Sequence, residues 1–516
     1  SVPENPREVA MAKTDFTKLY IDGAWREGSS ESMGRTRNPY TEEPLLELRL
    51  ASKADVDDAY RAASRAQPGW ARTPPQVRQR VLERVAQAVH FRREEIVEWL
   101  IRESGSTRVK AHLEVDLALN IIKESATFPL RMEGRILPSL WRDNENRLYR
   151  KPVGVVAVIT PWDFPFHVSM RSVAPILATG NALVLKPASA TPVTGGLLIA
   201  DLFEEAGLPG GLLNVLVGKS AEIGDLMVEH PAARAVSFTG STEVGRRVAE
   251  LAARQFKDAA LELGGNNAFI VLDDADLECA VDSAVYGKFL HQGQSCMAVN
   301  RFLVHERLYE PFIDRFVAKV KGLRVGNPID SETVIGPLIC REQVESIQAK
   351  LRESIRRGAV PVLQGEVRGN LMEPVVLRDV RNEMPIAREE VFGPVAPFIA
   401  FGDDEEAVRI ANATEYGLSG AIHSCHRERA VRLAQRIEAG MVHVNDTPVN
   451  DEPHVAFGGD KHSGLGRFGG EWALERFTRL QWVSVQHEPR EYPDAFGLGK
   501  AGEDDLNVSQ VMQTLH

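Results

Sequence analysis

Cysteine is scarce in this chain, with four residues among 516, and no short interval suggests that any two of them are paired. A chain of this length can bury enough apolar surface to be stable without disulfides. The sequence also lacks an apolar run of about 18 residues, which a membrane-spanning helix needs, and its first residues lack an apolar signal core. We therefore expect a cytoplasmic protein that is neither exported nor embedded in a membrane.

Excess positive charge is missing as well. The 61 Lys and Arg residues are outnumbered by 72 Asp and Glu residues, which gives a formal net charge of -11, and the basic residues are scattered along the chain. Proteins that bind nucleic acid concentrate Lys and Arg on one face, so we expect no nucleic-acid partner. We also expect no bound metal. The remaining composition is ordinary for a globular chain of two or three domains.

Two kinds of periodicity divide the chain. Between 54 and 125, apolar residues recur at intervals of three and four, which predicts packed helices. From 153 to 265, short apolar runs rich in Val, Leu and Ile alternate with segments of helix length. Such alternation predicts a parallel sheet covered on both faces, as in a Rossmann-like, doubly wound nucleotide-binding domain. A second alternation of helices and strands follows between 266 and 460.

Two segments are predicted to stand off this α/β body. EGRILPSL and NRLYRKPVG flank the polar turn WRDNE, which is typical of a β-hairpin. TRLQWVSVQ, residues 478–486, reads as a further strand, and we expect it to pair with the hairpin of a neighbouring copy. We make no structural prediction for 491–516.

Three motifs carry polar side chains at predicted strand ends, where open α/β sheets bind ligands. AVSFTGSTEVG runs from a strand through Gly240 and Ser241 into a helix, whose free N–H groups would face a phosphate. Lys186 ends the strand ALVLK, and Glu262 ends the strand AALE, where a raised pKa would suit a general base. Taken singly, each residue also fits a purely structural role: Ser241 as a helix cap, Lys186 as a solvated side chain and Glu262 as a surface carboxylate.

Cys296 lies in FLHQGQSCMAVNR, between small and polar residues. Three interpretations stay open: a small buried side chain, the nucleophile of a Cys-His hydrolase with His291 as the base, and a nucleophile for aldehydes. The sequence around it is not typical of a core, which favours a reactive thiol. The neighbouring nucleotide-binding domain favours redox chemistry on a thiol-bound carbonyl.

Together, residues 15–490 resemble the aldehyde dehydrogenase superfamily. The motifs that carry the resemblance are, in chain order, TPWDFP, VLKPASATP, FTGSTEVG, LELGGNN, GQSC, EEVFGP and AFGGDKHSG. The resemblance implies a Rossmann-like cofactor domain, an α/β catalytic domain and a small β oligomerisation arm, hence a homodimer or homotetramer. The implied boundaries are 15–130 with 151–261 for the cofactor domain, 262–461 for the catalytic domain, 131–150 with 478–490 for the arm, and 491–516 for a C-terminal extension.

The resemblance also implies a mechanism. The Cys296 thiolate attacks the aldehyde, the thiohemiacetal passes hydride to NAD or NADP, and water activated by Glu262 hydrolyses the thioester. The implied cofactor-binding residues are Thr160, Trp162, Lys186, Ser189, Gly240, Ser241, Val244, Leu263, Glu390 and Phe392. The implied substrate residues are Phe164, His167, Arg171, Leu290 and Phe457.

The sequence departs from the family's pattern in three ways, of which the first two concern Asp163 and Ser189. The Asn whose amide usually donates to the oxyanion is Asp163, and an ionised carboxylate accepts hydrogen bonds but donates none. The acidic residue often found three positions after the cofactor Lys is Ser189, whose neutral hydroxyl would not repel a 2′-phosphate. We therefore expect slow acylation unless Asp163 is protonated or turned away, and we expect NADP to be tolerated.

The resemblance is strongest to the benzaldehyde and vanillin dehydrogenase branch, through MRSVAP, VNDTPVNDEPHVAFGG and GLGRFGG. In the same branch, Ser172 and Phe468 replace a Lys and a Glu that many members use to release protons. An aryl aldehyde is thus the expected substrate. The alternatives are an aliphatic semialdehyde anchored through Arg171, a CoA-acylating enzyme, and a nucleotide-binding homologue with a decayed site.

Overall fold

The computed structural model describes residues 15–490 and residue 492. The chain divides into two compact units. The larger contains the described residues up to Arg131 together with Pro152–Thr478, and the smaller contains Met132–Lys151 with the described residues from Arg479 onward. No helix among the described residues is long and apolar enough to cross a membrane.

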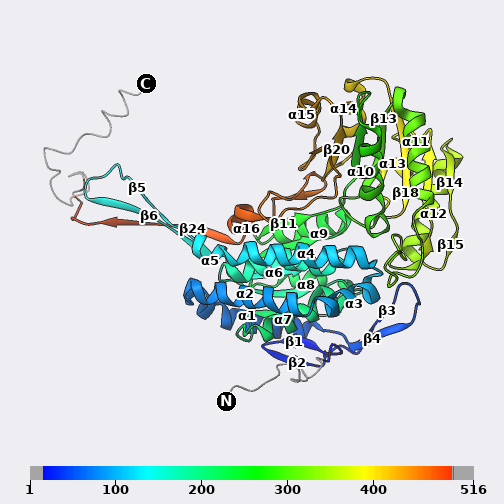
Figure 1. Ribbon diagram of the computed structural model, residues 1–516. Coiled ribbons are helices and arrows are strands. Elements are labelled where there is room, and N and C mark those ends of the chain that lie inside the picture. The colour runs from blue at the N-terminus through cyan, green and yellow to red at the C-terminus, as the bar shows by residue number, and fades with distance from the viewer. Residues whose placement is uncertain (1–14, 491, 493–516) are drawn as a thin grey trace, which may run out of the picture. The chain divides into compact units, whose positions relative to one another are not determined.

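An eight-stranded sheet forms the first half of the larger unit (Figure 1). Its five middle strands are parallel and correspond to the short apolar runs between 153 and 265, which confirms the predicted doubly wound arrangement. In spatial order, the strands are β2 (Ala24–Arg26), β1 (Leu19–Ile21), β9 (Leu213–Val215), β8 (Ala182–Lys186), β7 (Val155–Ile159), β10 (Ala233–Thr239), β11 (Asp258–Glu262) and β23 (Gly464–Leu465).

A seven-stranded sheet forms the second half, which confirms the α/β character expected after residue 266. In spatial order, its strands are β14 (Val360–Gln364), β17 (Val375–Arg378), β18 (Val395–Phe401), β13 (Val299–His305), β12 (Asn267–Val271), β20 (Gly420–His423) and β21 (His443–Val444). Two-stranded pairs complete this unit: β3 (Met33–Arg37) with β4 (Pro44–Arg49), β15 (Val367–Arg368) with β16 (Leu371–Met372), and β19 (Tyr416–Gly417) with β22 (Asp460–Lys461).

Helices cover these sheets, and those expected between 54 and 125 are present (Figure 1). The helices of the first half are α1 (Lys53–Arg72), α2 (Pro75–Phe91), α3 (Arg93–Ser104), α4 (Arg108–Ala126), α5 (Phe128–Arg131), α6 (Pro165–Ala178), α7 (Leu198–Glu205), α8 (Asp225–Glu229), α9 (Thr242–Ala253) and α16 (Gly470–Arg476). Those of the second half are α10 (Leu277–Phe289), α11 (Glu306–Lys321), α12 (Arg341–Arg356), α13 (Pro385–Arg388), α14 (Asp404–Asn412) and α15 (Arg427–Ala434).

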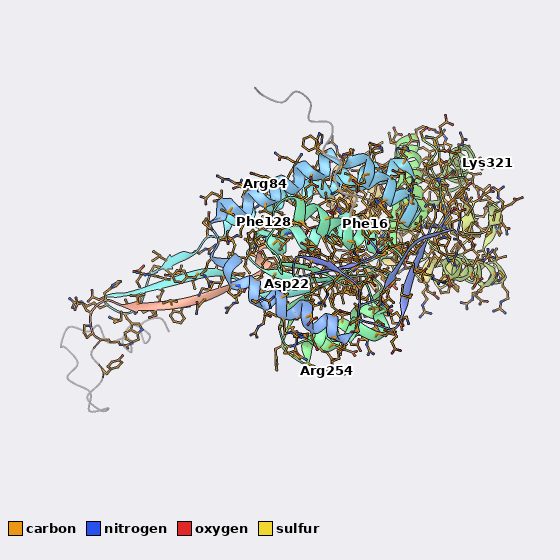
Figure 2. The ribbon with its side chains drawn as sticks, turned by 90° about the horizontal axis from the view of Figure 1, so that it is seen from below. Phe16, Asp22, Arg84, Phe128, Arg254 and Lys321 are labelled. Atoms are coloured by element: carbon orange, nitrogen blue, oxygen red, sulfur yellow. The ribbon has the colours of Figure 1, made fainter. Side chains whose placement is uncertain are left out.

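Side chains fill the space between helices and sheets (Figure 2). Phe128 is only 1% exposed, whereas Arg84, Arg254 and Lys321 are exposed. Apolar burial of this kind is the main stabilising contribution to such a fold. The core of the second half consists of two clusters of buried apolar residues, which pack on opposite faces of the seven-stranded sheet.

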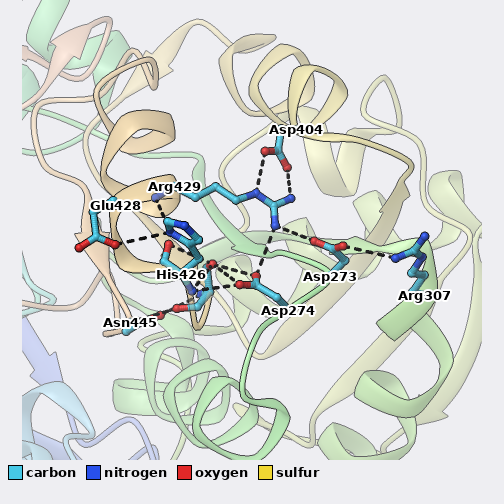
Figure 3. A network of polar contacts seen from close by, with 9 residues as sticks. Asp273, Asp274, Arg307, Asp404, His426, Glu428, Arg429 and Asn445 are labelled. Carbon is cyan, nitrogen blue, oxygen red and sulfur yellow. Dashed lines mark hydrogen bonds and ion pairs between the residues drawn. The ribbon is translucent and has the colours of Figure 1, made fainter.

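A polar network closes the end of β12 in the second half (Figure 3). Arg429 donates two hydrogen bonds to Asp404, at 2.5 and 2.8 Å, and one to Asp273 at 2.7 Å. Asp274 accepts from the backbone N–H of His426 at 3.0 Å. The network therefore ties α14 and α15 to the strand end through a shared guanidinium.

The smaller unit contains one three-stranded sheet of β5 (Arg135–Leu137), β6 (Asn144–Pro152) and β24 (Thr478–Gln486). The hairpin and the strand were both predicted, but the prediction that β24 pairs with a neighbour's hairpin was wrong. It pairs with β6 of its own chain. Trp482 Nε1 donates to Asn146 at 2.9 Å, and Asn144 donates to Ser484 and Gln486. These side-chain bonds add to the backbone ladder and fix the local pairing.

Candidate active site

The strand register brings several candidate residues to one edge of the eight-stranded sheet. Lys186 is paired with Ile159, the residue before Thr160, and Glu262 is paired with Thr239, the residue before Gly240. All of these are carboxyl ends of parallel strands, the edge at which open α/β sheets bind ligands.

Helix α6 supplies the next group, and every one of its residues is buried. Asp163 and Phe164 directly precede it, and a spacing of four residues places His167 and Arg171 on the same face. Lys110 of α4 donates to the backbone oxygen of Asp163 at 2.7 Å. The approach to α6 is thus held by a second helix.

Cys296 follows a turn in which His291, Gln292 and Gly293 have φ values of 52°, 60° and 76°. Such left-handed conformations are costly for residues other than glycine. The side chain of Gln292 holds the turn, because its Nε2 donates to the backbone oxygens of Gly105 at 3.2 Å and Pro337 at 2.9 Å.

A cavity of about 280 Å³ opens over Cys296. Four of the five predicted substrate residues line it: Phe164, His167, Arg171 and Leu290. The fifth, Phe457, is not among the lining residues, and its ring lies 3.8 Å from the guanidinium carbon of Arg171. Asp163 and Met297 also face the cavity, which combines an apolar wall with a few convergent polar groups, as small-molecule sites do.

Three acids around this cavity have raised pKa values. Burial raises the pKa of Glu262 to about 7, against the opposing effects of Arg171 and Cys296. Burial likewise raises the pKa of Asp163 to about 6, against the effect of Lys110. For the Cys296 thiol, burial and the neighbouring Glu262 and Asp163 carboxyls raise the pKa, while Arg171 lowers it. Near neutral pH, Glu262 can accept a proton from the thiol or from water.

Arg171 belongs to a buried cluster with two further side chains. Its Nη2 donates to Asp451 Oδ2 at 2.5 Å, and its Nη1 lies 3.9 Å from Glu262 Oε2. The Nε2 of His167 lies 2.7 Å from the same Asp451 oxygen. Asp451 was not among the candidates found in the sequence, because it lies in the loop after β21, where no periodicity marks it.

Lys110 and Glu114 were not predicted from the sequence either. Both side chains are fully buried, and Lys110 Nζ donates to Glu114 Oε2 at 2.5 Å. The other Glu114 oxygen accepts from the backbone N–H groups of Phe166 and His167, at 2.9 and 3.2 Å. The four-residue spacing of a Lys and a Glu in an apolar part of α4 is the signal that could have revealed this pair.

His291 is fully buried, and neither ring nitrogen has a hydrogen-bond partner. Its ring stands edge-on to Phe164 at 5.8 Å, and burial lowers its pKa well below the usual value. The residue that faces the Cys296 thiol is Glu262. This geometry disfavours a Cys-His hydrolase.

The residues suggested for a dinucleotide have suitable chemistry where they lie. Burial alone lowers the pKa of Lys186 to about 8, and no carboxylate neighbour offsets it, so its ammonium is available to a ligand hydroxyl or phosphate. Ser241 caps α9 by accepting from the backbone N–H of Val244 at 3.4 Å, and this helix start would favour an anion. Val244 itself is partly exposed, at 46%.

The remaining cofactor candidates are held in place by local contacts. Glu390 Oε1 accepts from the backbone N–H of Gly265 at 2.8 Å, and burial raises its pKa to about 7. Trp162 and Phe392 stand edge to face, 5.4 Å apart. Hydroxyl groups hold two of the smaller candidates: Thr160 Oγ1 accepts a hydrogen bond from Ser169, and Ser189 Oγ donates one to the backbone oxygen of Gly218 at 3.5 Å. Backbone N–H groups hold the other two: Gly240 donates to the backbone oxygen of Glu262, and Leu263 donates to that of Ser463. Together these groups fit a dinucleotide. No group of side chains suited to hold a metal is present in the described part of the chain.

A buried thiol beside a buried carboxyl that can accept its proton, at the ligand-binding edge of a doubly wound sheet, is the arrangement expected of an enzyme that forms a covalent cysteine intermediate beside a nucleotide. Residues 25–483 match the model of the aldehyde dehydrogenase family. The chain belongs to this family and is an NAD(P)-dependent aldehyde dehydrogenase.

Several relatives are similar over nearly their whole length. The chain is 53% identical over 479 residues to the benzaldehyde dehydrogenase YfmT of Bacillus subtilis, covering 93% of this chain and 99% of that protein. It is 50% identical over 478 residues to a vanillin dehydrogenase of Corynebacterium glutamicum, covering 92% and 99%. The crystal structure of an NAD-dependent benzaldehyde dehydrogenase from C. glutamicum has a TM-score of 0.86 and 46% identity, covering 92% of this chain and 98% of that one.

Proposed function

We propose that this protein oxidises uncharged aromatic aldehydes to carboxylic acids. The observation that carries the proposal is the cavity over Cys296, which has Phe164 and Leu290 in its wall and is wide enough for a substituted benzene ring. The relatives named for benzaldehyde and vanillin support the same substrate class.

Arg171 weighs against a semialdehyde with a distal carboxylate. This guanidinium would be the anchor for such a substrate, but Asp451 already occupies it with a hydrogen bond of 2.5 Å. A second carboxylate would meet the repulsion of Asp451 in a buried site, where charges interact strongly. An uncharged aryl aldehyde meets no such penalty.

In the proposed mechanism, Cys296 gives its proton to the neighbouring Glu262, and the sulfur bonds to the aldehyde carbon to form a thiohemiacetal. When bound, the nicotinamide accepts the hydride that this carbon gives up. Glu262 releases this first proton to solvent and then takes a proton from the attacking water, and the resulting hydroxide displaces Cys296, as a thiolate, from the thioester. A base whose pKa is about 7 can serve both proton transfers at neutral pH. Water as the acceptor distinguishes this proposal from a CoA-acylating enzyme.

Six residues would hold the dinucleotide. Lys186 and Ser189 would contact the adenosine ribose, Gly240 and Ser241 at the start of α9 would hold the pyrophosphate, and Glu390 and Phe392 would place the nicotinamide ribose and ring. The other candidates, Thr160, Trp162, Val244 and Leu263, would line the cleft.

A panel of aldehydes tests the substrate class. We expect kcat/KM for benzaldehyde and vanillin to exceed that for succinic semialdehyde and 4-carboxybenzaldehyde by about 100-fold or more, because one unfavourable buried charge costs several kcal/mol. Formation of reduced nicotinamide is followed at 340 nm, with the Cys296→Ala variant as the blank. Equal rates on charged and uncharged aldehydes would contradict the proposed class, and no turnover of any aldehyde would favour a decayed homologue.

The choice of nucleotide provides a second test. Because Ser189 has no charge to repel a 2′-phosphate, we expect KM for NADP to lie within about 10-fold of KM for NAD. In the Ser189→Glu variant, we expect KM for NADP to rise by about 10-fold or more while KM for NAD changes little. Strict use of NAD by the unmodified enzyme would contradict this expectation.

The assembly and location are further proposals. We propose a homodimer or homotetramer that associates through the three-stranded sheet of β5, β6 and β24, where Ile136, Leu480 and Trp482 are exposed at 71%, 57% and 67%. Exposed apolar side chains of this size are typical of an interface between subunits. The cytoplasmic location stays a prediction.

A further inference from the structure

Acids outnumber bases around the reacting groups. Among the residues that line the cavity over Cys296, the one Lys or Arg is Arg171. Asp163, Asp446 and Asp451 line the same cavity, and Glu262 lies beside the thiol. Both the thiolate and the Glu262 carboxylate must form in this buried space during the proposed reaction. A negative charge there is costly unless a cation lies beside it.

The position of Arg171 matches that need. Its guanidinium lies between two carboxyls, bonded to Asp451 and 3.9 Å from Glu262. Its Nη1 and Nε are buried without a hydrogen-bond partner, and both Glu262 oxygens are in the same state. Unpaired buried donors facing an unpaired buried acceptor are costly, so a small movement of either side chain would complete a charge-assisted hydrogen bond.

Two further groups fix the guanidinium in place. The ring of Phe457 lies against its face, 3.8 Å away, as in a cation–π contact. On the other side, Asp451 is held by His167 at 2.7 Å. Burial lowers the pKa of His167, so its ring is neutral. The same Nε2 also lies 3.1 Å from Arg171 Nη2, so His167 contacts both members of the ion pair. Against the cost of its burial, Arg171 and His167 lower the pKa of Asp451, which is therefore the anion that holds Arg171.

We propose that Arg171, held by Asp451, His167 and Phe457, is a positioning residue that keeps a positive charge beside Glu262 and Cys296. It supplies the favourable charge that Asp163 cannot give in place of the family's usual amide. Asp451 has two opposing effects: it fixes the position of the Arg171 guanidinium, and it partly neutralises the positive charge of that group. The inference rests on the proposed function, in which Cys296 is the nucleophile and Glu262 the base.

The charged neighbours of these groups are few enough to design a test. Those facing Glu262, Cys296 or Arg171 are Asp163, Asp451 and Glu390, with His167 behind Asp451 and with Lys110 and Glu114 behind Asp163. Asp446 lines the same cavity. Two substitutions change this balance in opposite senses at nearly constant volume. Arg171→Met removes a cation, and Asp451→Asn removes an anion.

The test measures how fast iodoacetamide alkylates Cys296 between pH 5 and pH 10, with the Cys296 peptide followed by mass spectrometry because three other cysteines are present. The reaction needs no aldehyde and no nucleotide, and its rate follows the thiolate fraction. We expect the midpoint to move up by about one pH unit or more in Arg171→Met and down by about one in Asp451→Asn. The pH profile of thioester hydrolysis should move the same way, because Glu262 shares these neighbours.

Two controls separate charge from packing. Arg171→Lys retains the cation and should keep the midpoint near that of the unmodified protein, even if kcat falls. Glu452→Gln removes an exposed charge next to Asp451 and should leave the midpoint of the alkylation profile unchanged. If Arg171→Met does not fold, the downward shift of the alkylation midpoint in Asp451→Asn is sufficient to test the inference.

Midpoints that stay fixed, or that move in the same direction in both variants, would overturn the inference. If the midpoints move as expected but no aldehyde is oxidised, the proposed function fails while the inference stands. If aldehydes are oxidised and the midpoints stay fixed, only the inference fails.

Discussion

Replacing Asp163 with Asn is expected to speed acylation by on the order of 100-fold at pH 8. The side chain lies buried beside the cavity, and its pKa is about 6. At pH 8 it is therefore a carboxylate, which repels the oxyanion of the thiohemiacetal and raises the pKa of Cys296. An amide of the same shape would remove the repulsion and add a donor. The single-turnover rate of nicotinamide reduction measures this step.

The pH dependence of that gain gives an internal check. Below about pH 6 the Asp163 carboxyl is protonated and can itself donate a hydrogen bond, so the ratio of variant to unmodified rate should shrink as the pH falls from 8 to 5.5. The Asp163→Ala variant removes the charge without adding a donor and should gain less than Asn. An unchanged or lower rate in Asp163→Asn would show that the carboxylate is turned away from the reacting carbon.

Replacing Lys110 with Met is expected to destabilise the protein by about 3–5 kcal/mol, since it leaves Glu114 as an unpaired buried charge. Lys110 Nζ also bonds Ser106 at 3.0 Å and the Asp163 backbone at 2.7 Å, so the start of α6 should loosen and kcat should fall. The first unfolding transition in urea, at fixed protein concentration, measures the loss.

The partner substitution identifies the cause of that loss. The double variant Lys110→Met with Glu114→Gln leaves no unpaired charge and should recover part of the stability, giving a coupling of about 1–3 kcal/mol. Lys123→Met, on the exposed side of the same helix, serves as the matched control and should change stability by less than about 0.5 kcal/mol. A loss equal to that of the control would contradict the role of the buried pair.

Much of the architecture could be predicted from the sequence. The five middle strands of the first sheet were found because they are continuous apolar runs, which a sheet buried on both faces requires. β14 and β20 of the second sheet were missed. β14 alternates exposed and half-buried residues in a strand of five, and β20 has only four residues, so neither presents a long apolar run.

The site could be predicted only in part. Cys296, Glu262 and Lys186 stand in recognisable motifs at strand ends or turns, where local sequence signals are strong. Asp451 and Lys110 act through partners far away in sequence: Asp451 meets Arg171 across 280 residues, and Lys110 meets Asp163 across 53. No periodicity encodes such contacts. They exist because the fold buries a charge that then requires a counter-charge.

The left-handed turn before Cys296 has a mechanical consequence. Gln292 holds that turn through the carbonyl oxygen of Gly105, which precedes α4, and that of Pro337, which precedes α12. Gly105 belongs to the first half of the larger unit and Pro337 to the second, so the turn is hydrogen-bonded to both halves. Any relative displacement of the two carbonyls would strain the same short stretch of backbone. The position of the Cys296 sulfur therefore depends on how the two halves pack against each other. Substitutions where the halves meet can alter the reactivity of Cys296 without contacting the substrate.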